Sequence, residues 1–73
     1  MNQENQKTRE EIRELNSRAW TIMLSDPQKG LDLCTTAREA AEELRYEEGI
    51  AESCLNQGWC NIYLGRYDIG LTV

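Results

Sequence analysis

Apolar residues recur at steps of three and four along three segments of the chain, which is the spacing of an amphipathic α-helix. In residues 4 to 24 this pattern runs through Ile12, Leu15, Ala19, Ile22 and Met23. From Pro27 to about Arg45 it runs through Gly30, Leu31, Cys34, Ala37, Ala41 and Leu44. A third segment has a broad apolar face made of Ile50, Ala51, Cys54, Leu55, Gly58, Trp59 and Ile62. The pattern predicts an all-α fold.

Signals for helix ends separate these segments. Asp26 predicts an N-cap, and Pro27 suits the first position of the next helix, where no amide hydrogen is missed. A turn is expected near Tyr46. Residues 64–66 (Leu-Gly-Arg) predict a further turn, and residues 67–73 then look like the opening of a fourth helix that lacks a terminating signal. We therefore expect three helices plus the start of a fourth, and a chain that is a fragment of a longer protein.

Two details predict how the helices pack. Arg38 and Glu42 are four residues apart and suit an outward ion pair. Gly58 inside a helix costs about 1 kcal/mol relative to alanine, so we expect a tight helix–helix crossing at this residue.

Composition excludes several classes of function. The 73 residues are 40% apolar, which suits one small domain (1–73) without a deep catalytic interior. There is no histidine, no phosphate-binding glycine loop and no serine in a strand-turn-helix context. Three cysteines, Cys34, Cys54 and Cys60, lack C-x-x-C spacing and predict small core residues rather than disulfides or a metal site. We expect no enzymatic activity, cofactor or metal.

The net charge of −5 is concentrated in one part of the sequence. Between Asp26 and Glu52 there are eight acidic residues and only three basic ones, while the flanking segments are neutral. This acidic segment disfavours nucleic acids and anionic membrane surfaces as partners. No stretch approaches the roughly 18 apolar residues of a membrane span, and the first residues lack the apolar core of a signal peptide. We expect a soluble, cytoplasmic protein.

The sequence also repeats itself weakly. A shift of 40 residues pairs Gly30-Leu31 with Gly70-Leu71, and a shift of 39 pairs Ala19-Trp20 with Gly58-Trp59. A repeated unit of about 40 residues that contains two helices is typical of a stacked helical array. The first hairpin spans about residues 4–45, and the second, truncated, spans about 47–73.

Ala51 to Leu71 resembles the first helix and turn of a tetratricopeptide repeat, with Gly58 and Gly70 at the small-residue positions and L-G-R-Y-D as the turn. Residues 15–45 resemble a preceding repeat with a longer second helix. Cys54, Gln57 and Asn61 depart from the family pattern. The longer repeat form is similar to arrays that precede bacterial signalling domains such as diguanylate or adenylate cyclases.

The resemblance implies a protein-interaction module, serving as the regulatory or dimerisation region of a larger bacterial signalling protein. In this family the first helix of each repeat lines a concave groove, and the resemblance places in that groove Asn16, Trp20, Met23, Asn56, Trp59 and Tyr63. A protein or peptide is the expected partner. The open face of the truncated hairpin predicts self-association through Leu55, Ile62, Ile69 and Leu71.

Two alternatives to this function stay open. In the first, the repeats form a purely structural spacer and Trp20 and Trp59 only pack between successive hairpins. In the second, the two rings bind a small ligand that changes the curvature of the array.

Overall fold

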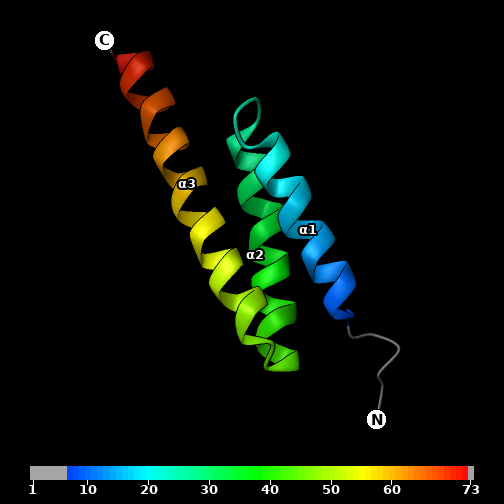
Figure 1. Cartoon of the computed structure of the whole chain (residues 1–73). Coiled ribbons are helices and arrows are strands. Elements are labelled where there is room, and N and C mark those ends of the chain that lie inside the picture. Colours follow the sequence, from blue (N-terminus) through cyan, green and yellow to red (C-terminus); the bar gives the residue numbers. More distant parts are fainter. Residues whose placement is uncertain (1–6, 73) are drawn as a thin grey trace.

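The computed structural model describes the backbone of residues 7–72 and the side chains of residues 7–65. Three helices account for most of this part of the chain: α1 (Arg9–Ile22), α2 (Pro27–Leu44) and α3 (Glu47–Thr72) (Figure 1). The predicted all-α class is confirmed, since the described residues include no strand.

A capping box fixes the start of α1. The Thr8 hydroxyl accepts a hydrogen bond from the Glu11 amide at 3.1 Å, and the Glu11 carboxylate accepts one from the Thr8 amide at 2.8 Å. This second bond is the main reason that the pKa of Glu11 lies below its ordinary value. The helix therefore begins at Arg9 and not near residue 4 as predicted.

The predicted start of α2 is confirmed. The Asp26 side chain accepts a hydrogen bond from the Lys29 amide at 3.1 Å, and Pro27 occupies the first turn. At the other end Arg45 adopts a left-handed conformation with φ of 56°, and the Tyr46 amide donates to the Ala41 carbonyl at 2.9 Å. A left-handed residue of this kind ends many helices. The chain reverses here, as the expected turn near Tyr46 requires.

The predicted turn at residues 64–66 and the predicted fourth helix are wrong. Instead α3 continues as one helix through these residues to Thr72. No glycine of the described chain has a positive φ, so Gly65 keeps the helical conformation that Arg45 abandons at the end of α2. Without a proline or a left-handed residue, continuing the helix satisfies the backbone amides and carbonyls that a turn would leave unpaired.

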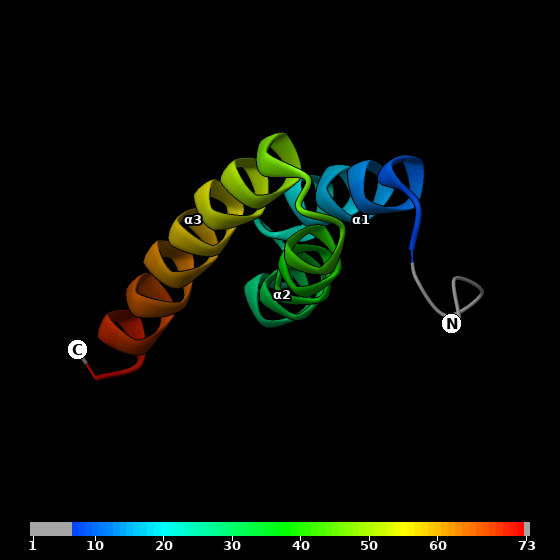
Figure 2. The ribbon, with the colours of Figure 1, turned by 90° about the horizontal axis from the view of Figure 1, so that it is seen from below.

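The first two helices form an antiparallel hairpin, and α3 runs in the same direction as α1 (Figure 1). Seen from below, α3 begins beside both helices and then leans away from the hairpin (Figure 2). The helices α1 and α3 therefore run parallel to each other, and α2 runs antiparallel to both.

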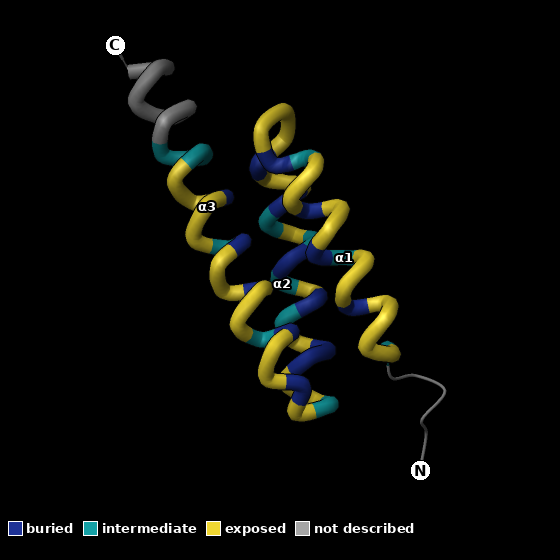
Figure 3. Tube along the Cα trace, in the orientation of Figure 1, coloured by how far each residue is buried: buried dark blue, intermediate teal, exposed yellow. Residues whose placement is uncertain are grey.

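Buried positions collect where the three helices meet (Figure 3). Near the α2–α3 turn the core consists of Ile12, Ala37, Ala40, Ala41 and Tyr46. Near the α1–α2 loop it consists of Ala19, Met23, Cys34 and Cys60. Most of the residues that α2 contributes to these two clusters are alanines. Their small side chains allow α1 and α3 to approach α2 closely.

The expected tight crossing at Gly58 is wrong, since no described atom lies within 4 Å of where its Cβ would be. The close approach is at Gly30 instead. A Cβ on Gly30 would lie 3.1 Å from the Sγ of Cys60 and 3.1 Å from the Cβ of Met23. Small size is needed where α1, α2 and α3 converge.

The broad apolar face expected on the third helix is not the side that packs on α1 and α2. The residues of α3 that are buried against α1 and α2 are Ser53, Asn56 and Cys60. Ala51, Leu55 and Ile62 are exposed on the other side of the helix. The polar side of α3 thus faces the core of this chain, while much of its apolar surface is left uncovered.

Candidate interaction surface

Five large apolar side chains of the described residues are exposed, one on α1, one in the loop between α1 and α2, and three on α3. Their exposed fractions are 57% for Trp20, 64% for Leu24, 61% for Leu55, 38% for Trp59 and 47% for Ile62. A large apolar side chain placed in water forgoes roughly 1.5–3 kcal/mol of burial free energy. Two of the five are tryptophans, the residue type with the largest apolar side chain.

Both tryptophans lie beside the line where α1 meets α3. Trp20 follows Asn16 by one helical turn, and Trp59 follows Asn56 by about one turn. Asn16 and Asn56 contact each other, and α1 and α3 run in the same direction, so the two rings lie on the same side of that contact. Leu24, which is also exposed, follows Trp20 by four residues in the loop between α1 and α2, and we call Trp20, Leu24 and Trp59 the tryptophan face.

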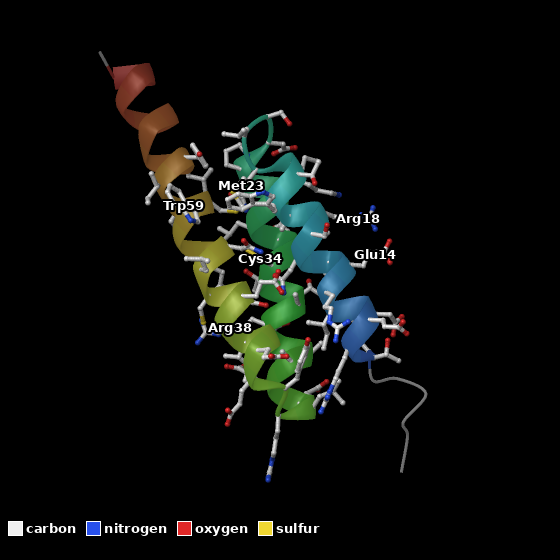
Figure 4. The ribbon with its side chains drawn as sticks, in the orientation of Figure 1. Glu14, Arg18, Met23, Cys34, Arg38 and Trp59 are labelled. Carbon is white, nitrogen blue, oxygen red and sulfur yellow. The ribbon has the colours of Figure 1, made fainter. Side chains whose placement is uncertain are left out.

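An aromatic neighbour packs against the tryptophan face, and two charged residues of α1 point away from it. The ring of Trp59 stacks on Tyr63 with centroids 6.2 Å apart and planes at 27°. Tyr63 is half-buried and packs against the core cluster that contains Met23. Glu14 and Arg18 project from the opposite side of α1, away from α3 (Figure 4). These two charged side chains therefore lie away from the contact between α1 and α3.

A buried polar network joins α1 to α3 under the tryptophan face. The Asn16 amide donates to the Ser53 hydroxyl at 3.0 Å. The Asn56 amide donates to the Asn16 side-chain oxygen at 3.1 Å and to its backbone carbonyl at 3.3 Å. All three side chains are buried. Such a network is stable only when every member is paired, so it fixes which turn of α1 lies against which turn of α3.

These positions correct the predicted groove. Trp20 and Trp59 are at the surface as expected, and Tyr63 is half-buried. Asn16, Met23 and Asn56 are buried, so their side chains belong to the core and do not reach a bound partner. Among the predicted self-association residues, Leu55 and Ile62 are exposed, while the side chains of Ile69 and Leu71 lie outside the described residues.

A spacing signal could have placed Asn16 in the core. The buried residues of α1 are Ile12, Asn16, Ala19 and Met23, at steps of four, three and four. An asparagine in phase with such a stripe faces the core, and a partner must then satisfy its amide. The partners come from α3, 37 and 40 residues away, and no local pattern identifies them.

The other end of the bundle is held by Tyr46. Its ring lies under the guanidinium of Arg9, 5.1 Å from centroid to Cζ, and its hydroxyl accepts a hydrogen bond from Arg13 Nε at 3.1 Å. That hydrogen bond is the main reason that the pKa of Arg13 lies above its ordinary value. Tyr46 thereby ties the start of α3 to the start of α1.

A second set of polar contacts joins α2 to α3. Arg38 donates to Gln57 Oε1 at 2.9 Å, and Gln57 donates to the Thr35 hydroxyl at 3.1 Å. Arg38 also pairs with Glu42 at 3.3 Å, which confirms the predicted ion pair. Its two partners hold Arg38 between α2 and α3, so this side of α3 is occupied by polar contacts rather than by apolar surface.

The three cysteines differ in environment. Cys34 and Cys60 are buried in one core cluster, but Cys54 is exposed, which corrects its expected place in the core. Cys54 and Cys60 are six residues apart on α3, a rotation of about 240°, so they cannot share a face. Burial raises the pKa of Cys34 to about 12, and burial raises the pKa of Cys60 as well.

We predict that one thiol per chain reacts with Ellman's reagent under native conditions. The thiolate is the reactive species, and raised pKa values keep Cys34 and Cys60 protonated at pH 8. The native protein should therefore release one equivalent of chromophore, which the Cys54→Ser variant should abolish, and the denatured protein three. Rapid release of three equivalents from the folded chain would contradict this burial.

The burial of Cys34 and Cys60 also makes the free energy of unfolding depend on pH. Because unfolding frees both buried thiols to ionise, the free energy of unfolding should fall as the pH rises above about 9.

Shallow hollows lie elsewhere on the surface. One lies between α1 and α2 and is lined by Ser17, Arg18, Thr21, Ile22, Ser25, Lys29 and Leu33. Among the side chains of residues 7–65, no three Cys, Asp or Glu side chains are placed to share a metal ion. In the same part of the chain, none of the helices combines the length and the apolar character needed to cross a bilayer.

Comparison of the chain with protein-family models, with curated protein sequences and with solved structures gives no significant match. The tetratricopeptide resemblance therefore stays a prediction.

Proposed function

We propose that this chain is a tetratricopeptide-like helical-repeat module that binds a segment of another protein across α1 and α3. The observation that carries the proposal is the tryptophan face: Trp20 and Trp59, on equivalent helices 39 residues apart, are both open to solvent. Aromatic side chains of this kind dominate the binding energy at protein interfaces.

The helix arrangement supports the repeat assignment. An antiparallel hairpin is followed by a third helix parallel to the first, and residues exactly one 40-residue unit apart, Asn16 and Asn56, contact each other. This contact is what the sequence shift of about 40 residues leads one to expect in a stacked array. A tetratricopeptide hairpin would have a turn after its first helix, whereas α3 continues without one. The structure therefore supports the repeat assignment through α1, α2 and α3, and not through a second hairpin.

The chemistry of the tryptophan face favours a peptide with apolar anchors. The rings of Trp20 and Trp59 and the side chain of Leu24 are apolar, and the buried asparagines offer no amides to a peptide backbone. An amphipathic helix presents apolar side chains at the spacing that such a face would cover. The acidic residues of α2 disfavour a strongly acidic partner.

Selection of peptides from a random library on the immobilised protein tests the proposal. We expect selected peptides to carry apolar residues at helical spacing and to change tryptophan fluorescence when they bind. Trp20→Ala and Trp59→Ala should each weaken binding at least tenfold, which corresponds to about 1.4 kcal/mol. Thr21→Ala, on an exposed neighbour in α1, should leave affinity unchanged.

Other results would favour the alternatives. A fluorescence response to small metabolites with no response to peptides would support the ligand sensor. Selected peptides whose affinity is the same for the wild-type protein and both tryptophan variants would contradict the proposed binding face.

A further inference from the structure

The outer side of α3 lacks the charged residues that keep a surface helix in water. Between Glu52 and Arg66 the sequence contains no charged residue on any side of the helix. Ala51, Leu55 and Ile62 are exposed here. A helix without a charged face is normally covered on both sides. In this chain α1 and α2 cover only the side of α3 that carries Ser53, Asn56 and Cys60.

Two glycines on this outer side pack against no side chain of residues 7–65. Neither Gly58 nor Gly65 has a positive φ, and no described atom lies within 4 Å of a Cβ built on either residue. Each glycine nevertheless costs about 1 kcal/mol relative to alanine in a helix. Gly30 and Gly49, in contrast, are packed tightly against neighbouring residues. The empty space above Gly58 and Gly65 is therefore room for atoms from outside this chain.

Large and small residues alternate on this side with a seven-residue period. Leu55 and Ile62 are seven apart, and Gly58 and Gly65 are seven apart, three residues after each large residue. Ile69 continues the large positions in the sequence. Two positions per seven residues form the contact line of a two-helix coiled coil. We call Leu55, Gly58, Ile62 and Gly65 the α3 seam.

We propose that the α3 seam binds the α3 seam of a second copy of this chain, with the two helices antiparallel. In the antiparallel register centred on Cys60, Leu55 lies opposite the partner's Gly65. In the same register, Gly58 lies opposite the partner's Ile62. Every large side chain then fills the space above a glycine, and the two-fold axis repeats each contact.

The parallel arrangement lacks this fit. It would place leucine on leucine and glycine on glycine, leaving voids, and it would bring Glu48 and Glu52 of both copies together.

Charge also favours this surface over others for self-association. With a net charge of −5, two copies repel each other through their acidic α2 surfaces, and the seam is the uncharged surface through which they can meet.

The contact is short, so the dimer should be weak. From Leu55 to Gly65 the helix rises about 15 Å, or about three turns. Interfaces of that size fall below the standard class of stable complexes. The dimer should form at tens to hundreds of micromolar and dissociate on dilution, with a Kd on the order of 100 µM. It does not depend on the proposed peptide binding, because the α3 seam excludes Trp20, Leu24 and Trp59.

Sedimentation equilibrium over about 10 µM to about 1 mM tests the proposal across the expected Kd. We expect the wild-type chain to dimerise. Leu55→Ser should abolish this, while Leu24→Ser, which removes a similarly exposed leucine from the loop between α1 and α2, should not. Gly58→Leu should also give a monomer, with unchanged helix content because its side chain enters open space. A wild-type chain that stays monomeric, or equal loss in both serine variants, would overturn the seam.

The register has its own test. Antiparallel helices centred on Cys60 place the two exposed Cys54 residues 12 positions apart along the axis, about 18 Å. A short bismaleimide should therefore leave the wild-type dimer uncrosslinked under conditions in which sedimentation detects it. Efficient Cys54–Cys54 crosslinking would place the two residues at one level and overturn the antiparallel arrangement.

Discussion

Asn16→Ala is expected to lower the free energy of unfolding by about 3 kcal/mol. The substitution removes the donor to the Ser53 hydroxyl and the side-chain acceptor for Asn56, both of which are buried. A buried polar group left without its partner costs about 1–3 kcal/mol, and the missing amide also leaves a cavity. A chain of this size has few kcal/mol in total, so much of the population should unfold.

Urea denaturation followed by circular dichroism measures this change. Asn61→Ala is the matched control, because Asn61 is an exposed asparagine on α3. It should change the midpoint only slightly. Equal midpoints for Asn16→Ala and Asn61→Ala would show that the network does not hold α1 to α3.

Gly49→Ala is expected to destabilise the fold by about 2 kcal/mol or more, even though alanine is the better helix former. A Cβ at this position would lie 2.6 Å and 2.9 Å from two ring carbons of Tyr46. The ring is held from the other side by Arg9 and Arg13, so it cannot move without losing both contacts. Overpacking a fixed aromatic ring outweighs the gain of about 1 kcal/mol in helix propensity.

Gly58→Ala is the control for the same chemical change on the same helix. No described atom would contact its Cβ, so the substitution should raise the thermal midpoint of the dilute, monomeric protein. Opposite signs for the two variants are the expected result. A stabilising Gly49→Ala would contradict the packing of Tyr46 against α3.

Local signals in the sequence account for much of the fold. The caps at Asp26 and Pro27 and the ion pair of Arg38 with Glu42 involve residues within four positions of each other, so spacing alone predicts them. The turn at residues 64–66 is predicted from Leu-Gly-Arg as a helix-end signal, and the resemblance to a repeat has a turn at the same place. In the structure Gly65 does not interrupt the helix, and α3 continues through it.

The candidate surface was harder to predict. Exposure of Trp20 and Trp59 agrees with the expected groove. Exposure of Leu55 and Ile62 agrees with the open face expected of the third helix, whereas the packing of Ser53 and Asn56 against Asn16 depends on residues 37 and 40 positions apart, which no local pattern identifies. Asn16 and Asn56 were assigned to that groove by family resemblance, and only the three-dimensional pairing of the two amides reveals their place in the core.

The central claim is that Trp20 and Trp59 form an open face on α1 and α3. Acrylamide quenching of the single-tryptophan variants Trp20→Phe and Trp59→Phe, at concentrations where sedimentation detects only monomer, tests it most directly. We predict that acrylamide quenches the remaining ring in each variant, with the Trp20 ring quenched more strongly and emitting at longer wavelength because it is more exposed than Trp59. Blue-shifted emission that resists quenching in both variants would show that the rings are buried and would contradict the account.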